Sequence, residues 1–95
     1  IVDAKLDYHV TSNRESGLGR YDVVMEPRDK KKDAFVFEFK VKNQDSKESL
    51  EDTVRNALKQ IEEKNYDAML IAKGIPKERI RHYGFAFEGK RVLIG

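Results

Sequence analysis

The chain has no cysteine among its 95 residues, which excludes a disulfide scaffold, a thiolate zinc site and a cysteine nucleophile. No apolar run approaches the roughly 20 residues of a membrane span, and no signal peptide is recognisable. A large charge excess is also lacking, because 19 Lys and Arg stand against 17 Asp and Glu. Charge alone therefore does not indicate a nucleic-acid binder. These absences favour a soluble, cytoplasmic protein.

The length fits one domain with a modest core, and neither a repeat nor a low-complexity linker divides it. The chain begins Ile-Val-Asp, without an initiator Met, and ends abruptly at Gly95. We therefore expect residues 1–95 to form a single domain cut from a longer protein.

Alternating and helical patterns divide the chain into elements. The apolar stripe of Leu50, Val54, Ala57, Leu58 and Ile61 predicts a helix that ends at Lys64. Asp45 and Ser46 are the expected N-cap residues, with Glu48 as the capping-box acid. The order of elements predicts a mixed α/β fold. Strands are expected at 5–11, 20–25, 34–41, 66–72, 81–87 and 91–94, a loop at 12–19, a charged hairpin connection at 27–33, and a final hairpin turn at 88–90.

The strand at 34–41 (AFVFEFKV) carries two charged residues in an otherwise apolar run. Successive side chains of a strand point to opposite faces of the sheet. The bulky apolar side chains therefore share one face, which we expect to be buried in the core. The residues of this aromatic face are Phe35, Phe37, Phe39 and Val41.

Three charged residues are expected on the opposite face. Glu38 and Lys40 lie there about 7 Å apart along the strand. If the hairpin pairs strands 20–25 and 34–41 with their apolar faces together, Asp22 joins them. The purely structural alternative is an edge strand whose solvated face carries a cross-strand ion pair, since charged residues mostly lie at the surface.

This arrangement suits metal-assisted chemistry. Two carboxylates on adjacent strands are natural ligands for Mg²⁺ or Mn²⁺, which prefer oxygen and keep several waters. Such a metal lowers the pKa of a bound water and neutralises charge on a phosphoryl oxygen. The ammonium of Lys40 would stabilise the negative charge that develops in the reaction.

The motifs then resemble a known family. Asp22 followed by Glu38-Phe39-Lys40 is similar to the D…ExK signature of the PD-(D/E)XK nuclease superfamily. Three longer blocks resemble the nuclease-like domain found C-terminal in bacterial AAA-ATPase-like proteins. They are residues 12–22 (SNRESGLGRYD, against SNrESGxGRyD), 57–66 (ALKQIEEKNY, against ALxQIxxKxY) and 83–90 (YGFAFEGK, against yGiaFxgK).

The resemblance implies a restriction-endonuclease-like core with a mixed central sheet: a three-stranded meander, a crossover helix, a further strand and a C-terminal hairpin. It implies a metal-dependent hydrolase that cleaves nucleic acid, with DNA as the first expectation and RNA as the alternative. Asp22 and Glu38 would be metal ligands, with the Phe39 carbonyl as an added ligand. Lys40 would be the catalytic lysine, and Gln60 matches a helix Gln that often completes the site.

One departure concerns a further acid that many superfamily members carry on a helix before the first strand. That helix is expected to be missing from this chain, so Glu15 is a candidate substitute, with a plain loop carboxylate as its alternative. Arg20 flanks the site and could contact phosphates. His9 and His82 are expected to be structural or surface residues, and Tyr66 a core-edge aromatic.

Two rival hypotheses remain open from the sequence. The chain could be a catalytically silent module that binds nucleic acid or a partner as an appendage of an AAA-ATPase-like protein. It could instead be a structural domain in which Asp22, Glu38 and Lys40 form only an ion-pair network. Homodimerisation, which is common among such nucleases, is a further expectation, although the sequence names no interface.

Overall fold

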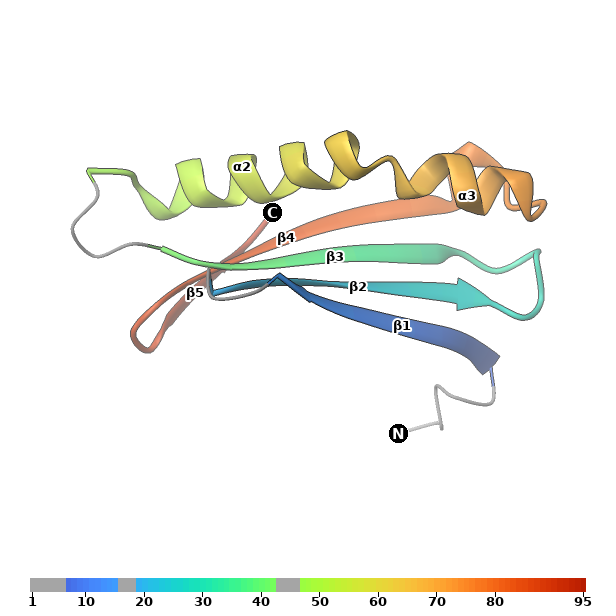
Figure 1. The fold of residues 1–95 in the computed structure, drawn as a ribbon, viewed down its shortest axis with the longest axis horizontal. Helices are drawn as coiled ribbons and strands as arrows, with labels where there is room; N and C mark the ends of the chain where they lie inside the picture. Colours follow the sequence, from blue (N-terminus) through green and yellow to red (C-terminus); the bar gives the residue numbers. More distant parts are fainter. Residues whose placement is uncertain (1–6, 16–18, 43–46) are drawn as a thin grey trace.

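The computed structural model describes residues 7–15, 19–42 and 47–95, and it consists of a sheet with helices on one face (Figure 1). The strands lie in the order β1-β2-β3-β4-β5. The elements are β1 (Tyr8–Glu15), β2 (Arg20–Pro27), β3 (Ala34–Val41), α2 (Leu50–Lys64), α3 (Tyr66–Ala72), the 3-10 helix η1 (Lys77–Arg79), β4 (Ile80–Glu88) and β5 (Arg91–Ile94).

The sheet is mixed, as predicted. β1, β2 and β3 form an antiparallel meander, β4 pairs parallel with β3, and β5 returns antiparallel along β4. Parallel neighbours need a long crossover connection, and α2 with α3 supplies it. The meander, the crossover helix and the C-terminal hairpin therefore confirm the mixed α/β prediction.

A capping box starts α2 later than predicted. The Ser49 hydroxyl accepts a hydrogen bond from the backbone N–H of Asp52, and the Asp52 carboxylate accepts one from the backbone N–H of Ser49. These two bonds satisfy donors that a helix start leaves open. Glu48 is not the capping acid and instead accepts a hydrogen bond from the Thr53 hydroxyl at 2.6 Å. The predicted caps at 45 and 46 lie outside the described residues.

Two predicted elements are wrong. Residues 66–72 form helix α3 rather than a strand. Helical spacing puts Tyr66 and Leu70 one turn apart on the side that packs against the core, where Leu70 is fully buried. The expected loop at 12–19 is also too long, because β1 runs on to Glu15 in register with β2.

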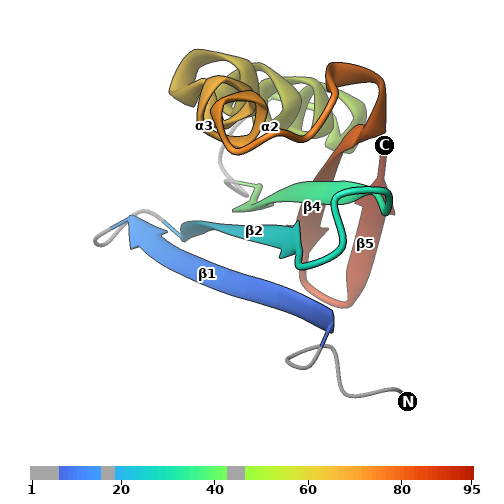
Figure 2. The same cartoon turned by 90° about the vertical axis from the view of Figure 1, so that its right-hand side faces the viewer.

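The prediction of which sheet face is buried is wrong as well. The helices cover one face of the sheet (Figure 2). That face carries Asp22 and Glu38 and is called here the covered face, while Phe35, Phe37 and Phe39 lie on the opposite, open face. Rings on the open face stay partly exposed. The covered face is lined by small side chains such as Ala34 and Ala86, which let a helix approach closely.

Gly84 shows how close that approach is. A Cβ at this position would lie 3.0 Å from the carbonyl oxygen of Val54 and 3.1 Å from the Cβ of Ala57. Only glycine leaves room for α2 to rest directly on β4. The stripe of α2 therefore packs close to the two acids in the middle of the sheet.

Among the described residues, no helix has the length and apolar character needed to cross a membrane.

Candidate functional site

One row of residues crosses the covered face with a member on each of four strands. Asn13 of β1 pairs with Asp22 of β2, Asp22 pairs with Glu38 of β3, and Glu38 pairs with Gly84 of β4. Paired residues of neighbouring strands project from the same face. The structure thus brings the carboxyl groups of Asp22 and Glu38 side by side, in the middle of the sheet.

Both acids are buried beneath the helices. Asp22 is 1% exposed and Glu38 is fully buried. Removing two carboxylates from water costs several kcal/mol each unless partners replace the lost hydration. The site must therefore contain positive charge or hydrogen-bond donors.

Lys64, the last residue of α2, supplies the positive charge. Its Nζ lies 2.7 Å from Oδ2 of Asp22 and 3.3 Å from Oε1 of Glu38. The ammonium is therefore held between the two acids, while its side chain stays 21% exposed.

Two further side chains hold Asp22 in place. The Tyr66 hydroxyl donates a hydrogen bond to Oδ2 of Asp22 at 2.8 Å, and the Asn13 amide donates one to Oδ1 at 3.2 Å. Burial, followed by the hydrogen bond to Asp22, raises the pKa of Tyr66 to about 12. The phenol therefore remains a donor at neutral pH, and Asp22 is oriented from three sides.

This donor set fits a divalent cation. Mg²⁺ is usually held by one or two carboxylates and completes its shell with water. The space between Asp22 and Glu38 already accommodates one cationic group, the Lys64 ammonium. In the described part of the chain, no cluster of three or more His, Cys, Asp or Glu side chains suited to a metal is present. The two adjacent carboxylates are thus the candidate ligands.

The remaining predicted site residues lie around this centre. Lys40 of β3 lies opposite Arg20 of β2 in the register of the sheet, next to the row of Asp22 and Glu38 on the covered face. Both side chains are half-buried. Gln60 is one helical turn before Lys64 and half-buried.

Phe39 and Glu15 have less defined places in the site. The Phe39 ring points to the open face, where it stacks on Tyr21 with ring centroids 4.5 Å apart, so only its backbone carbonyl could serve a metal. Glu15 ends β1 opposite Arg20, and its side chain lies outside the described residues. The roles of both residues stay predictions.

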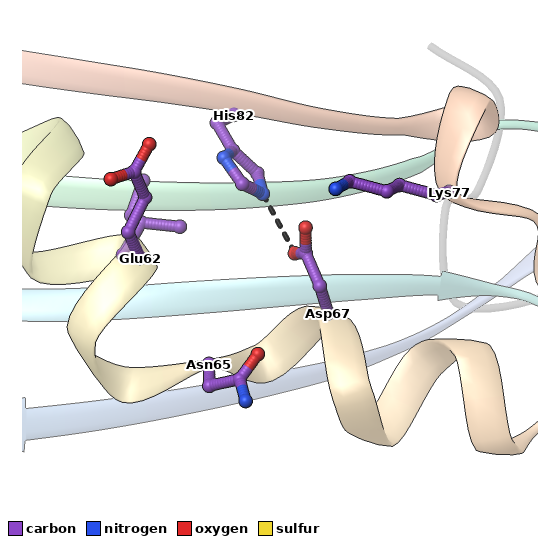
Figure 3. A pocket seen from close by; sticks show the side chains of 6 residues that line it. Glu62, Asn65, Asp67, Lys77 and His82 are labelled. Atoms are coloured by element: carbon purple, nitrogen blue, oxygen red, sulfur yellow. Dashed lines mark hydrogen bonds and ion pairs between the residues drawn. The ribbon is translucent and has the colours of Figure 1, made fainter.

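A second polar group lies in a separate hollow of about 270 Å³ between the helices and β4 (Figure 3). Nε2 of His82 is 2.7 Å from Oδ1 of Asp67, so the pair ties β4 to α3. His82 is thus a half-buried residue with a partner, in line with its predicted structural role. The hollow is lined by Ile61, Glu62, Asn65, Asp67, Lys77 and His82.

Sequence reasoning missed three members of the site: Asn13, Lys64 and Tyr66. The sequence predicts Tyr66 only at the edge of the core, yet its hydroxyl reaches Asp22. A signal for all three was present, because Asn13 lies in the first quoted block and the other two in the second. Periodicity could not find them, since Lys64 is 26 residues from Glu38 and 42 from Asp22.

Comparison with known proteins gives one match. A family model described as the PD-(D/E)XK nuclease superfamily matches residues 2–95. No curated protein matches the chain, and neither does any solved structure. The family match covers nearly the whole chain, including every strand and helix described above, and it agrees with a restriction-endonuclease-like core.

Proposed function

The chain belongs to the PD-(D/E)XK nuclease superfamily, and from that premise we propose that it is a divalent-metal-dependent nuclease. Its substrate would be nucleic acid, with DNA as the first candidate and RNA as the second. Its reaction would be the hydrolysis of phosphodiester bonds. The observation that carries this proposal is the buried pair of Asp22 and Glu38 with a cationic group held between them. A structural ion pair alone would not require two adjacent acids beneath one helix end.

Asp22 and Glu38 would hold Mg²⁺ or Mn²⁺, with the Phe39 carbonyl as an added ligand. The bound metal would neutralise charge on a phosphoryl oxygen and lower the pKa of a bound water. For the metal to sit between the acids, the Lys64 ammonium must leave that position. Its partial exposure, 21% of the side chain, gives it a route outward.

The chain's own residues would then serve the reacting phosphate. Lys40 lies two residues from Glu38 on the covered face and would stabilise negative charge as it develops. The displaced Lys64 ammonium would remain within reach of the same region and could contact the phosphate. Asn13 and Tyr66 would keep Asp22 oriented, and Gln60 would complete the site from α2. Arg20 would contact a neighbouring phosphate.

A cleavage assay tests the proposal. The full-length protein is incubated with Mg²⁺ or Mn²⁺ and with single- and double-stranded DNA and RNA. Asp22→Asn and Lys40→Ala are expected to reduce the cleavage rate at least 100-fold, the scale on which removal of a charge-stabilising group acts. Glu26→Gln is the matched control, because Glu26 lies on the same strand and face but pairs with Lys73.

Metal binding gives a readout that does not depend on turnover. Titration calorimetry with Mn²⁺ is expected to show one site in the wild type, weakened at least tenfold in Asp22→Asn and unchanged in Glu26→Gln. Absence of cleavage in the wild type on all four substrates would contradict the nuclease assignment. Metal binding that is indifferent to Asp22→Asn would contradict the ligand assignment.

The burial of both acids favours one second candidate. With Asp22 and Glu38 almost inaccessible and already paired with Lys64, the chain could be a silent module attached to an AAA-ATPase-like domain of the same cytoplasmic protein. That candidate predicts nucleic-acid or partner binding without cleavage. It is distinguished from the first by the metal titration, since it needs no metal site.

A further inference from the structure

The small net charge of the chain is unevenly distributed. Two segments, called here the basic end, carry most of the positive excess: residues 28–33, between β2 and β3, and residues 73–81, which lead from α3 into β4. They hold eight basic residues against three acidic ones, a net charge of +5, whereas the rest of the chain holds eleven against fourteen, a net charge of −3. The eight are Arg28, Lys30, Lys31, Lys32, Lys73, Lys77, Arg79 and Arg81.

The two segments of the basic end are held against each other. The Lys30 ammonium donates a hydrogen bond to the carbonyl of Lys73, and the Arg79 guanidinium donates one to the carbonyl of Lys31. Gly74 lies at this contact, since a Cβ there would be 3.3 Å from Cδ of Lys30. Figure 1 shows the β2–β3 connection and the end of α3 at the same end of the sheet. The basic residues therefore form one surface rather than two separate loops.

This surface suits a partner with several phosphates in a row. All eight basic residues are exposed. Because the rest of the chain carries an excess of negative charge, the field of the whole molecule draws a polyanion towards the basic end. Lys and Arg form strong, charge-assisted hydrogen bonds with phosphate oxygens. The affinity of such a surface grows with the number of phosphates that it neutralises, as in a nucleic-acid backbone.

A polar strip connects the acid site with the basic end. It consists of His9, Thr11 and Asn13, which alternate along β1 on the side of the sheet that carries the acids. β1 is an edge strand and lies farthest from the helices (Figure 2), and all three residues are exposed. The strip ends opposite Glu26, whose Oε1 lies 3.0 Å from Nζ of Lys73. The strip thus offers a nucleic-acid strand a route between the two surfaces.

The distance between the two surfaces corresponds to a few nucleotides. Ala34, where β3 begins next to the basic end, precedes Glu38 by four residues of the same strand. A strand rises about 3.3 Å per residue, so the basic end begins about 13 Å from the acids. Successive phosphates of one DNA strand lie about 3.4 Å apart along the duplex axis, so this distance spans about four nucleotides.

We propose that the basic end binds the phosphate backbone of the nucleic acid, about four or more nucleotides from the bond that the acid site cleaves. This inference rests on the proposed nuclease function and adds a remote contact that sets the minimum length of a good substrate. Contacts to phosphates carry no sequence information, so the basic end positions the substrate without selecting its sequence. Oligonucleotides that reach only the acid site are poor substrates, whereas longer ones are held at both surfaces.

Fluorescence anisotropy of the full-length protein with a labelled DNA duplex of about 20 base pairs tests the surface directly. EDTA prevents cleavage, so binding is measured without turnover. The triple variant Lys31→Gln, Lys32→Gln, Lys77→Gln removes three exposed charges and keeps the bonds of Lys30 and Arg79. It is expected to raise the Kd at least tenfold and to reduce the slope of log Kd against log salt by about 2 to 3, because each phosphate contact contributes about 0.9.

The matched control is the triple variant Lys47→Gln, Lys59→Gln, Lys90→Gln. It removes the same charge from exposed positions outside the basic end, and it is expected to change the Kd less than about threefold, since distant surface charges are screened. Equal losses of affinity in the two triple variants would overturn the proposal. Tighter binding to phosphatidylserine vesicles than to DNA would also overturn it, because the basic end would then fit a lipid surface.

A series of duplexes of increasing length tests the distance. The wild-type kcat/KM is expected to rise at least tenfold between about 6 and about 20 base pairs, whereas the basic-end variant keeps the rate on the shortest duplex and loses the rise. A basic-end variant with the wild-type length dependence contradicts the remote contact and leaves the nuclease function standing. A wild type that binds DNA through the basic end but cleaves no duplex contradicts the nuclease function and leaves the binding surface standing.

Discussion

The two faces of the sheet are built from the same strands but carry different kinds of side chain. On the covered face, Gly84 lets α2 approach closely, and the carboxylate of Asp22 is bonded to Lys64 and Tyr66 from the helices. On the open face, large aromatic rings stack side by side. The difference shows that the bulkiest residues of a strand need not mark the face that its own helices bury.

The largest expected effect comes from removing the ammonium that lies between Asp22 and Glu38. Lys64→Met keeps the side-chain stem but leaves two buried carboxylates without their ammonium, and breaking a buried pair in this way costs about 3 kcal/mol of the free energy of unfolding. Urea denaturation at neutral pH measures the loss. The control is Lys73→Met, whose partner is Glu26 and whose side chain is 47% exposed, so its cost stays below about 1 kcal/mol. Equal losses would show that the acid pair is not specially dependent on Lys64.

A matched pair of valines compares the two faces directly. Val24 is 3% exposed on the covered face, and Val10 is 42% exposed on the open face of the neighbouring strand. Val24→Ala is expected to lower the free energy of unfolding by about 2 kcal/mol, and Val10→Ala by less than about 0.5 kcal/mol. Thermal or urea unfolding at neutral pH measures both. Similar costs under these conditions would mean that the open face is covered within one chain.

The smallest expected effect is a pH dependence confined to the covered face. Because the pKa of Tyr66 is raised to about 12 from an ordinary value of 10, the folded state holds this proton more tightly than the unfolded state. The resulting stability is fully present below pH 10 and is lost as pH rises from 10 towards 12. The wild type should exceed Tyr66→Phe by about 1 kcal/mol at pH 8, given screening of a half-buried phenol, and by less at pH 11.

Chemical denaturation at the two pH values measures this difference. Tyr83→Phe, on the open face, is the control. If the advantage of the wild type over Tyr66→Phe did not shrink at pH 11, the hydrogen bond to Asp22 would not be the source of the stability.

Alternation along the strands was enough to predict the meander and the shared face of Asp22 and Glu38. It could not predict which face the helices cover, because a strand with apolar residues on both faces offers two equivalent choices. The choice depends on fit: Ala34, Ala86 and Gly84 make a surface that α2 can approach, and the phenylalanines do not. Which face α2 fits is decided by the packing of segments that lie far apart in the sequence.

Local pattern also could not predict that residues 66–72 form a helix rather than a strand. A short apolar run is ambiguous between helix and strand, and here Asn65 separates it from α2 without sending the chain back into the sheet. Tyr66, the first residue of α3, reaches Asp22 from this helix. The metal ligands could therefore be proposed from local pattern, whereas the groups that hold them required the tertiary fold.

The backbone of Asn65 decides how many donors one carboxylate oxygen receives. In an unbroken helix, Lys64 and Tyr66 would point about 200° apart around the axis. Asn65 adopts a left-handed conformation between them, with φ 53° and ψ 47°, and both side chains reach the same oxygen, Oδ2 of Asp22. The left-handed backbone of Asn65 thus lets one side chain from each of two successive helices donate to a single carboxylate oxygen.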